Sequence, residues 1–185
     1  GAVYVRWGRS ACHRGADLVY AGAMGGARIY DSGGGSGYLC LPYDPQYSER
    51  TIPRQSGRAA VWGTEYRVEH FPFTLPYRGI TSLMHHDVPC AVCMAISRHH
   101  VLMIPGRYDC YDGWRVEYVG YVMTGQKTDL GRMQHVCLDK DPDTVPGGYR
   151  AQNGSVVIPV EAKCGSLPCP PYAEGHEFSC VVCTR

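Results

Sequence analysis

The chain has 185 residues, with 18 Lys and Arg against 17 Asp and Glu, and its net charge at pH 7 is +1. This length suits one domain with a substantial core. The even charge balance argues against non-specific binding to nucleic acid, which depends on a basic surface. No stretch has the roughly 18 consecutive apolar residues of a membrane span, so we expect none.

Short strand-like runs follow one another along the chain, separated by glycine or proline. Gly (23), Pro (13) and Tyr (14) are abundant; the first two disfavour helices, and Tyr favours strands. Strands are predicted at 2–7, 17–21, 37–41, 59–68, 89–96, 101–105, 115–123, 134–138, 155–162 and 177–184. A turn is expected at 31–38, a polar surface loop at 42–58 and at most a helical turn at 82–86. The fold class is therefore all-β, a single domain over 1–185 with long loops, either sandwich-like or a closed antiparallel sheet.

Ten cysteines are spread along the chain. An even number of this size predicts a disulfide framework formed in an oxidising compartment, and hence a secreted, extracellular protein. The pairing cannot be read from the sequence. Zinc is the main alternative, because Cys90 and Cys93, and also Cys180 and Cys183, form C-x-x-C pairs. The two pairs lie farther apart than in a zinc ribbon, and no βαβ pattern supports a redox site.

Three aspartates stand at alternate positions in D-K-D-P-D: Asp139, Asp141 and Asp143, which we call the acidic segment. Their spacing matches the first ligands of an EF-hand, but positions 6 and 12 are Thr144 and Arg150, and no helices flank the loop. Two interpretations stay open at this point. The segment is either a non-helical calcium loop or a solvated acidic turn, which the neighbouring Asp-Pro and Pro-Gly-Gly sequences favour.

No catalytic motif stands out. The adjacent pairs His85-His86 and His99-His100 point to opposite faces if they lie in strands. His86 precedes Cys90 closely, but that thiol is expected in a disulfide and not as a free nucleophile. A carboxylate pair for glycoside hydrolysis is always conceivable, yet no pair is singled out by its spacing. We therefore expect a protein that is not an enzyme.

Several longer segments of the chain form a recognisable set. They are Y-V-R-W-G-R (4–9), G-Y-L-C-L-P-Y-D-P (37–45), H-D-V-P-C-A-V-C (86–93), G-W-R-V-E-Y-x-G-Y-x-M (113–123), V-E-A-K-C-G-S-L-P-C-P-P-Y (160–172) and E-F-S-C-V-V-C (177–183). Together they resemble the cysteine-rich globular domain of marine-invertebrate proteins called short-chain collagen C4-like, a family that includes a calcium-dependent, galactose-binding sea-anemone lectin. The resemblance covers nearly the whole chain, although no Gly-X-Y stalk is present.

The resemblance implies an extracellular β-domain in which a calcium ion coordinates sugar hydroxyls directly. The best matching metal ligands on this chain are Asp139, Asp141 and Asp143. The expected carbohydrate-binding residues are Gln152, Asn153 and Glu161, with Tyr149 or alternatively Trp114 as a stacking ring. Asp109, Asp112 and Glu117 form a reserve set of acidic candidates.

The expected function is thus calcium-dependent binding of glycans with galactose-type terminal sugars. Agglutination needs at least two sites per particle, which predicts a homodimer or larger oligomer. The alternative is a structural module of extracellular matrix that binds no sugar. Asn153-Gly154-Ser155 is an N-glycosylation sequon, and a glycan there would obstruct the expected pocket. Either the sequon is unused or the pocket lies elsewhere.

Overall fold

The computed structural model describes residues 1–75 and 79–185, and this part of the chain contains ten strands and no helix. The strands are β1 (Ala2–Trp7), β2 (Ala16–Gly26), β3 (Leu39–Pro42), β4 (Trp62–Tyr66), β5 (Pro89–Ala95), β6 (Val101–Pro105), β7 (Arg115–Thr124), β8 (Val136–Asp139), β9 (Ser155–Pro159) and β10 (Ser179–Thr184). Each overlaps one predicted run, so the all-β prediction is confirmed.

One local prediction is wrong. The stretch at 82–86 forms no helical turn; the chain turns at Met84 and His85 and then makes two antiparallel bridges. These bridges pair His86 with Tyr149 and Asp87 with Glu65. The local sequence was too short to outweigh backbone pairing with segments distant in the chain.

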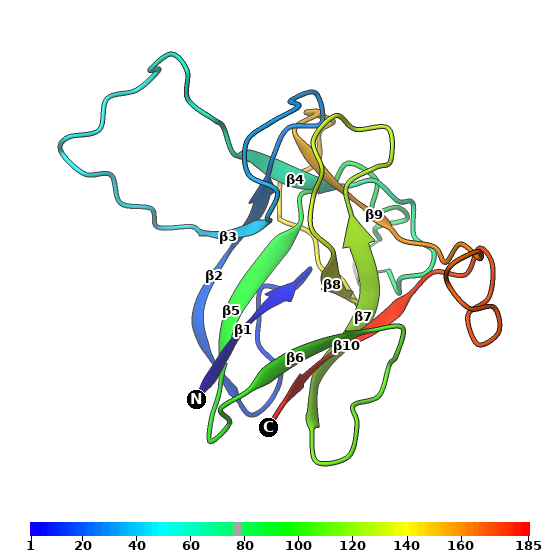
Figure 1. Ribbon diagram of the computed structural model, residues 1–185. Helices are drawn as coiled ribbons and strands as arrows, with labels where there is room; N and C mark the ends of the chain where they lie inside the picture. Colours follow the sequence, from blue (N-terminus) through cyan, green and yellow to red (C-terminus); the bar gives the residue numbers. More distant parts are fainter. Residues whose placement is uncertain (76–78) are drawn as a thin grey trace.

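Seven strands close into a barrel in the order β7-β8-β1-β5-β2-β4-β9, and β9 pairs back onto the end of β7. Most neighbours are antiparallel, whereas β1 with β8 and β4 with β9 are parallel. β3 pairs with β2, and β10 and β6 continue the sheet from the first part of β7. Figure 1 shows these strands crossing around a common centre. The closed sheet, and not the sandwich, is therefore the architecture.

The long strand β7 is covered on both faces over much of its length, since Glu117 and Met123 are buried as well as Tyr118 and Val122. Tyr118 and Val122 are buried on one face together with Gly120, whereas Val116 at the start of the strand is exposed. A side chain at Gly120 would overlap the backbone carbonyl of Leu138 in β8. Glycine at this position is what allows the two strands to approach so closely.

All ten cysteines are paired, which confirms the predicted disulfide framework. The bonds are Cys12–Cys93, Cys40–Cys90, Cys110–Cys183, Cys137–Cys180 and Cys164–Cys169. Each C-x-x-C pair is divided between two bonds, because residues three apart in a strand point to opposite faces. Cys90 and Cys93, for example, pack into different core clusters. The zinc and redox interpretations are therefore wrong.

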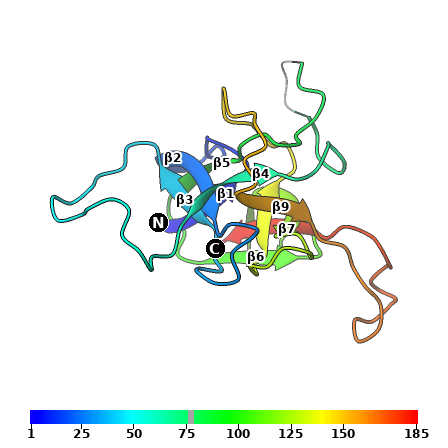
Figure 2. The ribbon, with the colours of Figure 1, turned by 90° about the horizontal axis from the view of Figure 1, so that it is seen from above.

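Two long connections extend away from the barrel. Residues 43–61 between β3 and β4 are exposed throughout, as the sequence predicts for a polar surface loop, and the segment around the Cys164–Cys169 bond is largely exposed as well. Figure 2 shows the two connections on opposite sides of the barrel. Within the described residues, no helix is long and apolar enough to cross a membrane.

Candidate functional site

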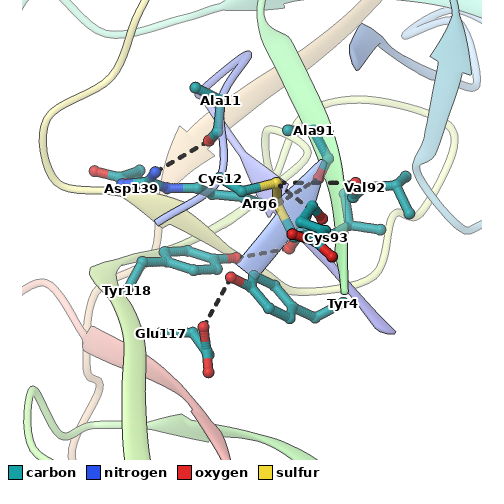
Figure 3. Close-up of a disulfide and its surroundings, with 12 residues drawn as sticks. Tyr4, Arg6, Ala11, Cys12, Ala91, Val92, Cys93, Glu117, Tyr118 and Asp139 are labelled. Atoms are coloured by element: carbon teal, nitrogen blue, oxygen red, sulfur yellow. Dashed lines mark hydrogen bonds and ion pairs between the residues drawn. A yellow bond between two sulfur atoms is a disulfide. The ribbon is translucent and has the colours of Figure 1, made fainter. Parts of the chain in front are cut away.

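The acidic segment starts inside the sheet. Asp139 is the last residue of β8 and is only 2% exposed. Arg6 in β1 donates from Nε to Asp139 Oδ2 at 2.8 Å, and the backbone N–H of Asp141 donates to Asp139 Oδ1 at 2.9 Å. The guanidinium of Arg6 also lies 5.9 Å from the ring centre of Tyr118 (Figure 3). The charge of Asp139 is thus balanced within the fold.

The other two aspartates of the acidic segment also have basic partners. Lys140 Nζ lies 3.0 Å from Asp141 Oδ2, and Arg9 Nε lies 3.1 Å from Asp143 Oδ2. Across residues 1–75 and 79–185, no three His, Cys, Asp or Glu side chains are grouped so that they could hold a metal ion. Calcium binding by Asp139, Asp141 and Asp143 stays a prediction, and an ion there would compete with three ion pairs.

Glu161 lies apart from the other expected sugar-binding residues. It follows β9, forms a bridge with Glu177 and lies 3.7 Å from Lys163. It lines a surface depression with the end of β7, whereas Gln152 lines a different cavity. The structure therefore does not bring Glu161 together with Gln152.

The reserve candidates are dispersed too. Glu117 is buried in β7, where it accepts hydrogen bonds from Tyr4 (2.9 Å, Figure 3) and Thr184. Asp109 and Asp112 lie in the exposed connection between β6 and β7. Trp114 packs against the small core cluster of that region, so it does not stand beside the expected sugar residues.

Gln152 lines a cavity that the sequence did not predict. The cavity has a volume of about 250 Å³ and lies between β4, the bridged residues before β5 and the loop that precedes β9. We call it the Glu65 cavity. Its lining residues are Ala23, Met24, Trp62, Gly63, Thr64, Glu65, Asp87, Val88, Val145, Gln152 and Gly154.

Glu65 is the most unusual of these residues. It is the last but one residue of β4 and is only 1% exposed. The backbone N–H of Gln152 donates to its Oε1 at 2.8 Å, but the buried Oε2 has no hydrogen-bond partner among the described residues. A buried carboxylate oxygen is costly unless a hydrogen bond or a cation compensates it. Glu65 is therefore suited to a ligand that supplies such a partner.

Two hydroxyls beside Glu65 share this property. Thr64, which lines the cavity, is paired with Ser155 across the parallel strands β4 and β9. Both side chains are buried, and neither hydroxyl has a hydrogen-bond partner within the described part of the chain. Thr64 is a lining residue of the cavity and Ser155 is not. Because Thr64 and Glu65 are neighbours in β4, their side chains point to opposite faces of the strand, so these two hydroxyls are not counted among the groups that could bind a ligand.

Asp87 supplies the second carboxylate of the cavity. Its backbone is bridged to Glu65, so the two residues lie opposite one another on neighbouring segments. Burial raises the pKa of the Asp87 carboxyl, and the neighbouring His86 opposes this rise. A side chain at Gly148 would overlap the Asp87 carboxylate. The glycines of the P-G-G-Y sequence therefore let the loop close over Asp87.

Aromatic residues stand at the rim. Tyr149 is 65% exposed, and its ring centre lies 4.4 Å from that of His86, next to Asp87. Trp62 forms part of the cavity wall, and the guanidinium of Arg28 lies 4.9 Å from its ring centre. Arg28 also stacks on Tyr30 at 5.1 Å, which restrains the tryptophan from one side.

Asn153 lies beside the cavity without lining it. It is exposed and has a φ of 53°, a left-handed conformation that asparagine tolerates better than most residues. Arg67 donates from Nη2 to its side-chain oxygen at 3.5 Å. Of the expected sugar-binding residues, Gln152 alone lines this cavity, while Asn153 is its neighbour in the chain and Tyr149 is bridged to His86 beside Asp87.

The sequence did not point to Glu65 or Asp87. A glutamate within a short strand is normally read as part of the solvent-exposed face, and nothing in W-G-T-E-Y reveals that both faces are covered. Asp87 belongs to no acidic cluster or ligand motif in the sequence. The sequence does contain one signal for Asp87: it stands two residues before the buried strand β5, which places a carboxylate at the end of that strand.

The cavity offers two carboxylates and a side-chain amide. Oxygen ligands of this kind suit hard cations and the hydroxyls of sugars, and they suit zinc or copper less well. The chain matches no model of a known protein family.

Proposed function

We propose that this protein is a calcium-dependent carbohydrate-binding domain, a lectin for galactose-type terminal sugars, and that the ligand binds in the Glu65 cavity. The observation that supports this most is the buried Oε2 of Glu65, which lacks a partner among the described residues and belongs to a cavity that also contains Asp87. The proposal shifts the expected ion from the acidic segment, where each carboxylate has a basic partner, to a cavity in which Glu65 Oε2 has no hydrogen-bond partner among the described residues.

The charges and atoms of the cavity fit calcium. Glu65 and Asp87 together balance the charge of one divalent ion, and the side chain of Gln152 offers a neutral oxygen. Calcium accepts six to eight oxygen ligands in flexible geometry. A bound ion would supply open coordination positions for two neighbouring sugar hydroxyls, while the chain's own side chains orient the ring.

The size and the walls of the cavity favour a single sugar ring. Its volume of about 250 Å³ is below the ~300–1,000 Å³ of pockets that enclose drug-sized ligands. The side-chain amide of Gln152 both donates and accepts hydrogen bonds, as a sugar hydroxyl does. Trp62 and Tyr149 provide flat apolar surfaces against which the C–H face of a sugar can pack.

The setting is proposed as extracellular. Five disulfides are compatible with an oxidising environment. We propose a secreted protein that binds glycans without catalysis, assembled as a homodimer or larger so that each particle carries several sites.

Calorimetry with galactose tests the proposal. Wild type, Glu65→Gln and Asp141→Ala are each titrated with calcium and again with a chelator. We expect calcium-dependent binding by wild type and Asp141→Ala, and none by Glu65→Gln. If all three proteins bind galactose equally with calcium and with chelator, the proposed role of calcium is wrong. If only Asp141→Ala loses galactose binding, the site lies in the acidic segment and not in the Glu65 cavity.

Two other outcomes favour other functions. If none of the proteins binds galactose, and a glycan array with calcium is also negative, the structural matrix module becomes the better interpretation. Turnover of a glycan that is lost in Glu65→Gln would instead indicate glycoside hydrolysis, which uses a pair of carboxyl groups.

A further inference from the structure

The sequon at the cavity has an arrangement that the sequence alone could not reveal. Asn153 is the only asparagine of the chain and is exposed, whereas its neighbours Gln152 and Gly154 line the Glu65 cavity. The backbone N–H of Gln152 is fixed by Glu65 at 2.8 Å. The backbone next to Asn153 is therefore held by a carboxylate of the cavity lining.

The Asn153 side chain is accessible for modification. Arg67 engages the oxygen of its amide, and a glycan would be attached to the nitrogen. Ser155, the third residue of the sequon, is completely buried, and its hydroxyl has no hydrogen-bond partner among the described residues. A transferase that must recognise Ser155 can therefore act only before β9 has paired with β4.

From these positions we propose that Asn153 carries an N-linked glycan that lies over the mouth of the Glu65 cavity and lowers its affinity for ligand. The inference that the glycan controls binding rests on the proposed function, whereas its attachment does not. The covering effect follows from chain connectivity, because the glycosylated residue lies between two residues of the cavity lining.

The covalent step is a simple displacement. The side-chain nitrogen of Asn153 forms a bond to C1 of the first sugar of a lipid-diphosphate-linked oligosaccharide. The bond from C1 to the phosphate oxygen breaks, the lipid diphosphate leaves with the electron pair, and the amide nitrogen loses one proton to a base of the transferase. No oxidant or reductant is needed.

Ser155→Ala is the appropriate variant for a test. It removes the sequon and keeps Asn153, whereas enzymatic removal of the glycan would convert the asparagine into aspartate and add a charge at the rim. The Ser155 hydroxyl has no partner to lose in the described structure, so its removal should leave the fold intact. Wild type and Ser155→Ala, both made in bacteria without glycans, serve as the matched control and should bind galactose equally.

The experiment compares wild type and Ser155→Ala secreted from the same eukaryotic cells. Mass spectrometry should find a glycan at Asn153 of the wild type and none in the variant. In calcium, galactose should bind the variant about tenfold more tightly, as expected if the glycan covers the mouth for about nine-tenths of the time. Secreted wild type without a glycan would overturn the proposal, and so would equal affinity of the two proteins.

A readout without ligand separates this inference from the proposed function. Trp62, a wall residue of the cavity that is 37% exposed, can be labelled with a tryptophan-specific reagent and quantified by mass spectrometry. The glycan should slow its labelling relative to Ser155→Ala. If neither protein binds galactose, the proposed function fails, but the labelling rates still decide whether the glycan covers the cavity: equal rates would contradict it.

Discussion

Two groups of carboxylates in this barrel have opposite surroundings. In the acidic segment, Asp139, Asp141 and Asp143 each lie within about 3 Å of a basic side chain, at 2.8, 3.0 and 3.1 Å. In the Glu65 cavity, Glu65 has a buried oxygen without a partner in the described structure, and Asp87 has only the nearby His86. The sequence makes the first group conspicuous, but the structure makes the second one the better candidate for a cation.

This comparison shows that clustering along the chain is a poor guide to ligand binding. Like charges that are close in sequence repel one another unless opposite charges lie nearby. Here Arg6 in β1 pairs with Asp139, and Arg9, which follows β1, pairs with Asp143. The two carboxylates of the cavity come from separate segments, Glu65 from β4 and Asp87 from the bridged residues before β5. Replacing a carboxylate by its amide at each site removes one charge with little change in shape, so the substitutions can be compared directly.

The largest effect is expected for Asp139→Asn. It leaves the mostly buried Arg6 without its ion-pair partner, and breaking a buried pair in this way costs about 3–5 kcal/mol. Urea unfolding measures the change. In the double variant Arg6→Met, Asp139→Leu most of the stability should return, because both charges are removed together. A loss below about 1 kcal/mol in Asp139→Asn would show that the pair is not structural.

Gly148→Ala should lower the affinity of the Glu65 cavity for calcium without removing a charge. The added methyl group meets the Asp87 carboxylate and displaces it. We expect calcium affinity to fall by about 10–100-fold, the range typical of changes to groups that orient metal ligands. Calcium calorimetry measures this. Gly35→Ala, at a position where a methyl group meets nothing within 4 Å, is the control and should bind as wild type does.

In metal-free protein, Glu65→Gln should increase the free energy of unfolding, whereas Asp139→Asn should decrease it. It removes a buried charge that lacks a cationic partner and keeps an oxygen that can accept from Gln152. We expect a gain of about 1–2 kcal/mol in the free energy of unfolding when a chelator is present. Destabilisation by this substitution would mean that the charge of Glu65 is compensated within the protein.

The smallest effect is expected for Asp143→Asn. The side chains of Asp143 and Arg9 are 40% and 31% exposed, and ion pairs of this kind contribute about 0–1 kcal/mol. The melting temperature should change little, and added salt should reduce the difference further. A loss comparable to that of Asp139→Asn would remove the distinction between the buried and the exposed pair.

Much of the fold was predictable, because it depends on local patterns. Short runs of strand-forming residues coincide with the ten strands, and glycines and prolines separate them. Barrel closure was not predictable, since it rests on the pairing of β9 with Met123 and Thr124 at the end of β7. The candidate site was only partly predictable for the same reason. Gln152, a candidate from the sequence, lines the cavity, whereas Glu65 and Asp87 meet through pairing between separate segments.

Calcium calorimetry on three proteins tests most directly whether Glu65 and Asp87 bind the ion. The proteins are wild type, Glu65→Gln and the double variant Asp141→Asn, Asp143→Asn, each freed of metal beforehand. We predict one calcium ion per chain with the same affinity for wild type and the double variant, and no binding by Glu65→Gln. Wild-type binding by Glu65→Gln together with its loss in the double variant would place the ion in the acidic segment and contradict the proposed site.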